Sequence, residues 1–323
     1  MTRRRTVSVN EAFPLPSLFP FVSWTRNVVA GQKQERSARF EAWELTGDPW
    51  EPEAITLYGR AGIEHKGKEI REILEFAKSI AAQPPAAIEI GSHRGAFLVG
   101  VARNHAPNAV IGMEIRGRYH RLAGETMQKN GVENAVLFKG DGKLATIIAI
   151  PPESLDAVYV NFPDPWWKKR HASRRVLDVA FLRVLARRLK PRGRLYLKSD
   201  VFEYLHAVRK FAEASEAFRP LAPERWPDER AWTWTEREAK CMRGAVPFGR
   251  GYYERKRDFD SSLPLAPEDL PELDWEEMIV GRADIKGRPP VDKEARRRTA
   301  EAARRRAEED AYDRDASEET DDI

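Results

Sequence analysis

Leu155-Asp-Ala-Val-Tyr-Val-Asn-Phe-Pro-Asp-Pro-Trp-Trp-Lys168 is the most informative stretch of the chain, because it turns a buried strand abruptly into a rigid loop. The first part, from Leu155 to Val160, is largely apolar and predicts a buried strand. Pro163 and Pro165 end the strand, since each lacks a backbone N–H and pushes the preceding residue into extended geometry. We therefore expect Asp164 at the carboxyl end of a strand, where open α/β sheets bind ligands.

Strand and helix patterns alternate on both sides of this stretch. Apolar residues recur at helical spacing from Ile70 to Ile80, and Pro84-Pro85 ends that helix. Alternation of this kind predicts an α/β fold with a mostly parallel sheet and right-handed crossovers. The expected strands are 86–90, 110–115, 135–139, 155–162, 194–198 and a late strand at 251–257, and further helices are expected at 96–101, 119–129, 179–189 and 202–214.

Charge is distributed unevenly along the chain of 323 residues. From Asp260 onward there are 20 acidic and 11 basic residues, whereas the rest holds 31 acidic and 44 basic residues. A basic body with an acidic tail fits a nucleic-acid partner, although charge of this size also serves solubility. The basic run Lys168-Lys-Arg-His171 directly follows the rigid acid Asp164, which suggests chemistry on a polyanion.

The pattern divides the chain into three parts. Residues 1–65 are rich in aromatic residues without clear periodicity and are expected as an N-terminal extension that wraps on the body or docks a partner. Residues 66–258 form the expected catalytic domain. Residues 259–323 form a charged C-terminal tail, partly helical or disordered, in which Glu294–Arg298 and Glu301–Arg305 are favourable pairs for a helix at 292–310.

Several classes of protein are disfavoured by composition. The single Cys241 excludes an internal disulfide and a multi-cysteine zinc site, and no metal site is expected. Prolines interrupt the apolar residues 15–24, which are too short for a membrane span. We expect a cytoplasmic protein with no membrane association.

A candidate cofactor site lies where the first strand of the alternating region turns into a helix. Glu89-Ile-Gly-Ser-His-Arg-Gly95 places Gly91 and Gly95 in this turn, and glycine lets a ligand approach the backbone closely. Glu114 ends the second strand, where an acid can accept hydrogen bonds from both hydroxyls of a ribose. Asp141 follows the third strand and suits an adenine amine or a cationic group. Each of these acids also has a plain alternative as a cap, strand end or turn residue.

The pattern favours S-adenosylmethionine over a nicotinamide cofactor. The turn lacks the G-x-G-x-x-G spacing of dinucleotide sites. The negative charge of Glu89 opposes a pyrophosphate, whereas a sulfonium and an ammonium group would be attracted to it.

The segment from Glu89 to about Leu205 resembles the bacterial tRNA (guanine-N7)-methyltransferases. The strongest match is Phe162-Pro-Asp-Pro-Trp-Trp-Lys-Lys-Arg-His171, followed by Arg174-Arg175. Leu189-Lys-Pro-Arg-Gly-Arg-Leu-Tyr-Leu-Lys-Ser-Asp200 resembles the fifth strand of the family and its aspartate. Thr233-Trp-Thr-Glu236 resembles the T-x-x-E stretch of the family.

The resemblance implies a Rossmann-like class I methyltransferase with a mostly parallel seven-stranded sheet and helices on both faces. It implies S-adenosylmethionine as cofactor and a guanine in the variable loop of tRNA as substrate. By position, the family assigns cofactor contacts to Glu89, Gly91, Glu114, Asp141 and Asp164, a catalytic role to Asp164, and substrate contacts to Lys168, Asp200, Thr233 and Glu236. Oligomeric state is left open between monomer and homodimer, and the tail is a possible site for a protein partner.

The residues around Asp164 are suited to binding tRNA, although several of them could serve a structural role instead. Lys168, Lys169, Arg170, Arg174 and Arg175 are expected to neutralise tRNA phosphates. Trp166 and Trp167 are candidates for stacking on bases, although one of them is expected to pack on the core. We interpret His171 as a phosphate or structural contact. Thr233 and Glu236 fit a helix capping box equally well.

Two other functions remain open at this stage. Asn161-Phe-Pro-Asp164 loosely resembles the N-P-P-[YFW] loop of enzymes that methylate exocyclic amines, which leaves open a methyltransferase for another RNA site. The family usually carries a further glycine where this chain has Ser92-His93-Arg94. That departure leaves open a non-catalytic RNA-binding protein of the same fold.

Overall fold

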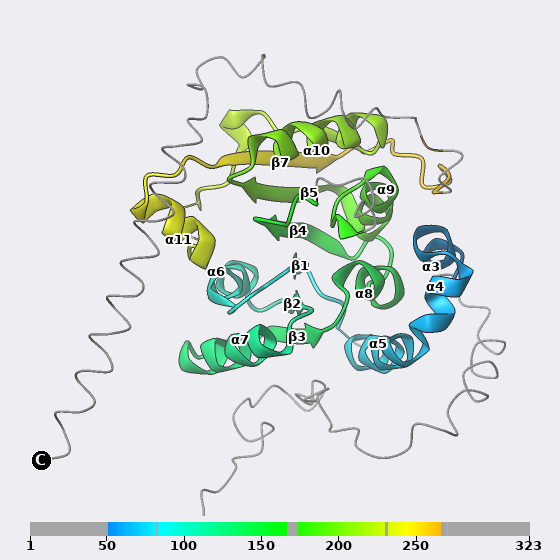
Figure 1. Cartoon of the computed structure of the whole chain (residues 1–323), viewed down its shortest axis with the longest axis horizontal. Helices are drawn as coiled ribbons and strands as arrows, with labels where there is room; N and C mark the ends of the chain where they lie inside the picture. The colour runs from blue at the N-terminus through cyan, green and yellow to red at the C-terminus, as the bar shows by residue number, and fades with distance from the viewer. Residues whose placement is uncertain (1–50, 82, 167–173, 230–231, 266–269, 271–323) are drawn as a thin grey trace, which may run out of the picture. The chain divides into compact units, whose positions relative to one another are not determined.

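One sheet organises the part of the chain that is described. The computed structural model describes residues 51–265 except 82, 167–173 and 230–231, together with residue 270. Within these ranges, seven strands lie in the order β3-β2-β1-β4-β5-β7-β6 (Figure 1). The strands are β1 (Ala87–Ile90), β2 (Val110–Glu114), β3 (Ala135–Lys139), β4 (Leu155–Asn161), β5 (Leu189–Ser199), β6 (Phe218–Pro220) and β7 (Gly249–Arg255).

The sheet has a topological switch point between β1 and β4. Strands β1 to β5 pair in parallel, whereas β7 runs antiparallel to both β5 and β6. The chain moves outward from β1 through β2 to β3 and then returns to the other side of β1 with β4. Ligands bind at such a point in open α/β sheets, outside the carboxyl ends of the strands. The mostly parallel, seven-stranded sheet that we expected is therefore confirmed.

Helices cover both faces of the sheet, because neighbouring residues of each strand point to opposite sides. On β4, Val158 and Val160 join the core that contains α5, α8, α9 and α10, whereas Tyr159 joins the core with α6 and α7. Figure 1 shows α5 and α8 on one side of the sheet and α6 and α7 on the other. The helices are α3 (Glu51–Tyr58), α4 (Arg60–His65), α5 (Gly67–Ile80), α6 (Ala96–His105), α7 (Gly117–Lys129), α8 (Gly142–Ala149), α9 (Val179–Arg188), α10 (Phe202–Ala214) and α11 (Glu236–Arg243), with a 3₁₀ turn at Pro223–Arg225.

The folded core extends beyond the expected domain at both ends. Ala54 of α3 and Ile63 of α4 are fully buried, although both belong to the expected N-terminal extension. Phe259 and Leu265, which the sequence analysis assigned to the tail, are also buried in this core. Residues on either side of 66–258 thus contribute to the same folded unit.

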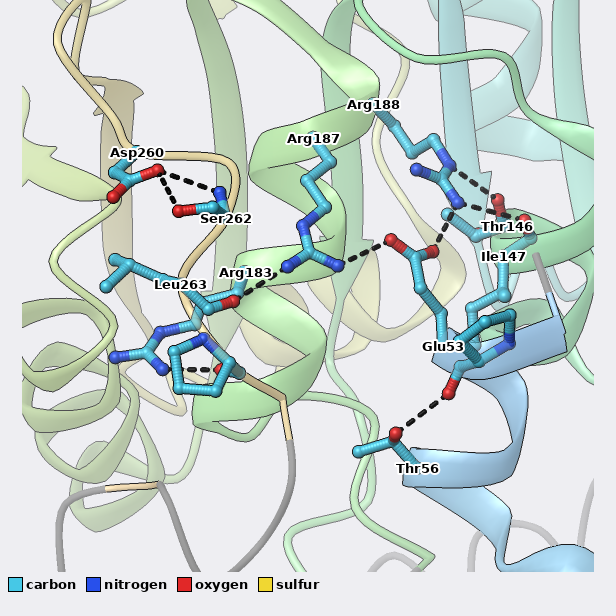
Figure 2. A network of polar contacts seen from close by, with 12 residues as sticks. Glu53, Thr56, Thr146, Ile147, Arg183, Arg187, Arg188, Asp260, Ser262 and Leu263 are labelled. Carbon is cyan, nitrogen blue, oxygen red and sulfur yellow. Dashed lines mark hydrogen bonds and ion pairs between the residues drawn. The ribbon is translucent and has the colours of Figure 1, made fainter. Parts of the chain in front are cut away.

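Three arginines of α9 tie these outer segments to the sheet domain (Figure 2). Arg187 donates to Glu53 of α3 at 2.6 Å and to the Leu263 carbonyl at 2.7 Å. Arg188, which is nearly fully buried, pairs with the same Glu53 and donates to the Ile147 carbonyl of α8 at 3.0 Å. Arg183 donates to the Pro264 carbonyl at 2.6 Å. One helix therefore binds both ends of the folded unit.

Chain contacts divide the protein into residues 1–279 and residues 280–323. The second unit, with the helix expected at 292–310, lies outside the described residues, as do residues 1–50. Among the residues that the structure describes, no helix is long and apolar enough to cross a membrane.

Candidate active site

The turn after β1 has the backbone geometry that a bound ligand needs. Gly91 and Gly95 have φ of +84° and +77°, values that glycine adopts without steric cost. A Cβ on Gly91 would meet no atom within 4 Å, so open space lies beside the backbone there. A Cβ on Gly95 would lie 3.1 Å from Ala123, so this glycine allows α6 and α7 to pack closely. The two glycines therefore serve different purposes: space for a ligand and contact between helices.

Glu89 lies at the switch point as a buried carboxyl group. Its Oε1 accepts a hydrogen bond of 3.2 Å from Asn161 Nδ2, which joins β1 to β4 directly across the switch point. Its Oε2 is buried and has no hydrogen-bond partner among the described residues. Burial raises the pKa of Glu89 to about 8; the bond from Asn161 opposes this rise, and the negative charge of Glu114 adds to it. A cationic group placed here would stabilise the ionised form.

Glu114 ends β2 and organises the same turn. Its Oε2 accepts from the backbone N–H of His93 at 2.9 Å, and its Oε1 accepts from that of Arg116 at 2.8 Å. Each carboxylate oxygen has a second lone pair and can accept one further hydrogen bond. Glu114 thus lies where the sequence analysis expected an acceptor for ribose hydroxyls.

Unpartnered buried oxygens around the turn test whether S-adenosylmethionine fits this site. Glu89 Oε2 and Ser92 Oγ are each buried without a hydrogen-bond partner among the described residues. Buried polar atoms are normally hydrogen-bonded, so these acceptors point to a missing donor. An ammonium group supplies three N–H donors and a positive charge. The residues present therefore fit the amino-acid end of the cofactor.

Asp141 is more heavily engaged than the sequence suggested. Its Oδ1 caps α8 by accepting from the N–H groups of Lys143 and Leu144, as an N-cap residue does. Its Oδ2 accepts from Tyr58 at 2.9 Å and from Lys66 at 3.3 Å, which come from the N-terminal helices. These contacts match the alternative in which Asp141 is an ordinary turn or cap residue. A contact between Asp141 and the cofactor stays a prediction that requires Tyr58 or Lys66 to move.

The loop that carries Asp164 begins at the carboxyl end of β4. We call this end of the parallel strands, where the glycine turn also lies, the mouth of the candidate site. Phe162 has a φ of +50° and redirects the chain, while its N–H donates to the Lys198 carbonyl at 2.7 Å. Asp164 follows as an exposed residue. Arg174 lies over the Trp166 ring at 5.0 Å. Asp164 thus follows Asn161, the partner of Glu89, by three residues and is exposed to solvent.

Arg175 differs from our expectation of a phosphate contact. It is 8% exposed, and its Nε donates to the Trp166 carbonyl at 3.2 Å, so it braces the loop from inside. Its position in a basic run concealed this structural role. Lys168, Lys169, Arg170, Trp167 and His171 lie outside the described residues.

A buried lysine holds α11 beside the site. Lys198, near the end of β5, pairs with Glu238 of α11 at 2.9 Å and with Glu229 at 3.0 Å. Burial opposes ionisation of Glu229, but hydrogen bonds from Arg250 and Tyr252 and the charge of Lys198 lower its pKa to about 2. The sequence analysis did not single out Lys198, because a lysine inside a strand gives no sign of burial.

The expected substrate residues of the C-terminal part are brought to the same end of the sheet. Asp200 follows β5 and forms an ion pair with Arg237 of α11. Thr233 is exposed, and its backbone N would lie 2.6 Å from a Cβ on Gly100, so the segment before α11 lies directly on α6. Figure 1 shows α11 beside α6. Asp200 and α11 thus lie near each other after β5, and contact of these residues with a substrate stays a prediction.

The capping box exists but begins at a different threonine. Thr235 accepts from the N–H of Glu238 at 2.9 Å, and Glu238 accepts from the N–H of Thr235 at 3.4 Å. The capping alternative for Thr233 and Glu236 is therefore wrong by two residues. Glu236 is left free of that role and lies 3.2 Å from His93 Nδ1 and 3.4 Å from Arg94 Nε.

Ile115 is an exposed apolar residue beside the candidate site that the sequence analysis did not single out. It directly follows Glu114 and is 65% exposed, which is unusual for an isoleucine beside a buried acid. A flat apolar ring bound next to the ribose would cover it. Within the described part of the chain, no three His, Cys, Asp or Glu side chains gather in a way that could hold a metal ion.

The sheet order and the glycine turn at its switch point are those of the Rossmann-like class I methyltransferase fold. A family model described as "putative methyltransferase" matches residues 83–248. A tRNA (guanine-N(7)-)-methyltransferase of Synechococcus sp. is 32% identical over 200 residues, 60% of this chain and 82% of that protein. The chain belongs to the tRNA (guanine-N(7)-)-methyltransferase family.

Other relatives match over a smaller share of their length. The Thermus thermophilus protein of the same name is 35% identical over 53% of this chain and 48% of its own length. The chain thus spans about half the length of that relative. Among solved structures, a SAM-dependent O-methyltransferase from Thermotoga maritima has a TM-score of 0.37 at 16% identity, covering 59% of this chain and 66% of that one.

Proposed function

We propose that this protein transfers the methyl group of S-adenosylmethionine to N7 of a guanine in tRNA. The observation that carries the proposal is the hydrogen bond between Glu89 and Asn161 across the switch point. This bond joins the ends of β4 and β1, and it supports a position for the loop with Asp164, which follows β4, near the turn that fits the cofactor. A base presented to Asp164 is therefore next to the methyl donor, as an in-line transfer requires.

The cofactor side of the reaction is assigned to the turn and its acids. When bound, S-adenosylmethionine supplies an electrophilic methyl group on a sulfonium. Glu89 would face its positive charge, Glu114 would accept from its ribose, and Gly91 would leave room for it beside the backbone. Ile115 would cover one face of the adenine.

The chemistry at N7 needs no catalytic base. Guanine N7 carries a lone pair that is unprotonated at neutral pH and lies on the major-groove edge of the base. Positioning of the base and electrostatic stabilisation of the transition state are then sufficient for methyl transfer. Methylation makes the guanine cationic, so a fixed carboxylate at Asp164 stabilises the charge that develops. Asp200, Thr233 and Glu236 are proposed to hold the substrate around it, and Lys168 to contact a phosphate.

The proposal is tested by incubating the purified protein with unmodified bulk tRNA and methyl-labelled S-adenosylmethionine, followed by digestion to nucleosides. We expect the label in 7-methylguanosine. Label in a nucleoside methylated on an exocyclic amine would overturn the N7 assignment and favour the alternative suggested by Asn161-Phe-Pro-Asp164. Absence of label together with absence of cofactor binding by calorimetry would favour an RNA-binding protein without catalysis.

Asp164→Asn should lower the rate of methyl transfer by about 10²–10³-fold, because it removes a preorganised charge near the developing cation. Asp164 is exposed, so the fold should persist. The readout is single-turnover transfer to tRNA at saturating cofactor. Asp258→Asn, an exposed aspartate away from the mouth, is the matched control and should keep the full rate. Equal rates for both variants would remove Asp164 from the mechanism.

The proposal places this activity in the cytoplasm, where tRNA is matured. The acidic tail from residue 259 is proposed as a possible contact for a protein partner. Sedimentation of the full chain at several concentrations decides between monomer and homodimer.

A further inference from the structure

His93 adopts a strained conformation at the cofactor turn. Its φ of +49° is uncommon for a residue with a side chain, and glycine would adopt it freely. Strain of this kind persists only where surrounding contacts hold the residue in place. The backbone contact is the hydrogen bond of 2.9 Å from the His93 N–H to Glu114, which keeps the turn against the end of β2.

The side chain of His93 provides two further contacts. Its ring packs against Tyr119 of α7 with centroids 3.9 Å apart, and its Nδ1 lies 3.2 Å from Glu236 Oε2 of α11. Burial lowers the pKa of His93, although the charges of Glu236 and Glu114 oppose that shift. A glycine at this position would keep the turn and lose both contacts.

Glu236 is held from the turn on one side and from its own helix on the other. Arg94 Nε lies 3.4 Å from the same oxygen that faces His93, and Lys240 lies 3.6 Å from the second oxygen. Despite these ion pairs, Oε2 is buried and accepts no well-aligned hydrogen bond within the described residues. The contact between turn and helix therefore has stabilisation still to gain if either partner shifts slightly.

The backbone at the start of α11 is fixed independently of this contact. Glu238 is bound to the buried Lys198 and closes the capping box with Thr235, so the first turn of the helix is well anchored. The adjustable part is the side chain of Glu236, which lies between these two residues in the sequence, together with residues 93 and 94 of the turn. These residues lie between the turn that is proposed to bind the cofactor and the helix that is proposed to bind tRNA.

We propose that His93 is a positioning residue that links the cofactor turn to Glu236, so that cofactor and tRNA strengthen each other's binding. The inference rests on the proposed function, because it treats Glu236 as part of the tRNA-binding side. A ligand that orders the turn would align Glu236 for tRNA, and by linkage tRNA would tighten cofactor binding by the same factor.

The test measures the affinity for unmodified tRNA with and without saturating S-adenosylhomocysteine, which occupies the cofactor site without transferring a methyl group. For the natural protein we expect saturating S-adenosylhomocysteine to raise the affinity for tRNA on the order of tenfold, which is within the usual range of coupling between sites. Titrating the cofactor product with and without tRNA must give the same factor.

Three variants separate positioning from folding. His93→Gly removes the imidazole at a φ that glycine accepts, and should reduce the coupling to about twofold or less while each separate affinity stays within about threefold. His93→Asn keeps a donor at the place of Nδ1 and tolerates positive φ, so it should restore most of the coupling. In the double variant with Glu236→Gln, His93→Gly should have no further effect.

Ala245→Gly is the matched control, since Ala245 has the same φ of +49° in an exposed position after α11, and it should leave coupling unchanged. Full coupling in His93→Gly overturns the inference, as does failure of His93→Asn to restore it. A natural protein that methylates tRNA but shows no coupling also overturns the inference and leaves the proposed function standing. A natural protein that binds no tRNA in either state overturns both.

Discussion

Glu89 is the residue whose environment most directly predicts a measurable behaviour. It is buried at the switch point, and one of its oxygens is bonded to Asn161, whereas the other has no hydrogen-bond partner in the described part of the chain. Its strand position and its carboxylate could be inferred from the sequence, because an acid at the end of a buried strand is unusual. The raised pKa of Glu89 could not be inferred from the sequence, because it depends on how fully β1 and β4 exclude water from the carboxyl group.

Cofactor affinity should therefore rise with pH between 6 and 7.5. Without cofactor, Glu89 is mostly protonated in this window, because burial raises its pKa to about 8. A cationic ligand favours the ionised carboxylate, so binding expels the proton and becomes up to about tenfold weaker for each pH unit below 8. Calorimetry in buffers of different ionisation enthalpy should detect the released proton.

Glu89→Gln provides the control for this prediction, because glutamine resembles the protonated acid and cannot lose a proton. Its cofactor affinity should be low and independent of pH over the same window. A natural protein with flat affinity from pH 6 to 7.5 would show that Glu89 does not face a positive charge.

Other residues show where sequence reasoning is limited. Asp141 was correctly placed after β3, but Tyr58 and Lys66 reach it from a part of the chain that no local pattern connects with it. Arg175 belongs to a basic run, yet its side chain turns inward to the loop backbone. In both cases the partner is set by tertiary packing, which spacing along the sequence does not encode.

At the scale of elements, segments with a clear apolar pattern and clear flanking residues were predicted well, and segments without them were missed. The ends of α10 and β3 agree with expectation, because a strong apolar pattern and clear flanking residues mark them. The short α8 is almost continuously apolar and includes β-branched residues, so its pattern does not distinguish helix from strand. The helix α11 was not predicted, and the capping-box alternative named the wrong threonine, since two threonines each precede a glutamate at the capping distance.

The contact between α6 and the segment before α11 supplies a prediction at this scale. Gly100→Ala would place a Cβ 2.6 Å from the backbone N of Thr233, which must move away. We expect the free energy of unfolding to fall by about 1–3 kcal/mol, as for other overpacked sites. Affinity for tRNA should weaken while affinity for the cofactor stays within about threefold, because the turn itself is untouched.

Gly62→Ala is the matched control, since a Cβ there meets only an ordinary contact of 3.6 Å with Tyr58. It should leave tRNA affinity unchanged and raise stability by about 0.5–1 kcal/mol through helix propensity. If Gly100→Ala behaves in the same way, the segment before α11 does not depend on its contact with α6.

For the whole molecule, the central finding is that segments outside the expected domain complete its core. The α/β alternation was sufficient to predict the parallel sheet, because each strand and crossover is local. Packing of the N-terminal extension on the body was one of its two expected roles. The partners of α3 and the burial of residues 259–265 were not predictable, since the arginines of α9 that bind them look like an ordinary charged helix end.

Glu53→Ala should destabilise the protein by about 3–5 kcal/mol, because it leaves the buried Arg188 and its neighbour Arg187 without their shared carboxylate. Chemical denaturation monitored by tryptophan fluorescence measures the change. Glu75→Ala breaks an exposed pair with Lys78 and should cost less than about 1 kcal/mol. Similar losses for both variants would show that α3 is not bound through the arginine network.

The most direct test of the account is methyl transfer to a tRNA transcript in which every guanosine is replaced by 7-deazaguanosine. This transcript keeps the base-pairing edge and the phosphates but carries a C–H group in place of the N7 lone pair. We predict steady incorporation of label into the ordinary transcript and none into the substituted one, with similar tRNA affinity for both. Equal incorporation into the two transcripts would contradict the assignment of guanine N7 as the methylated atom.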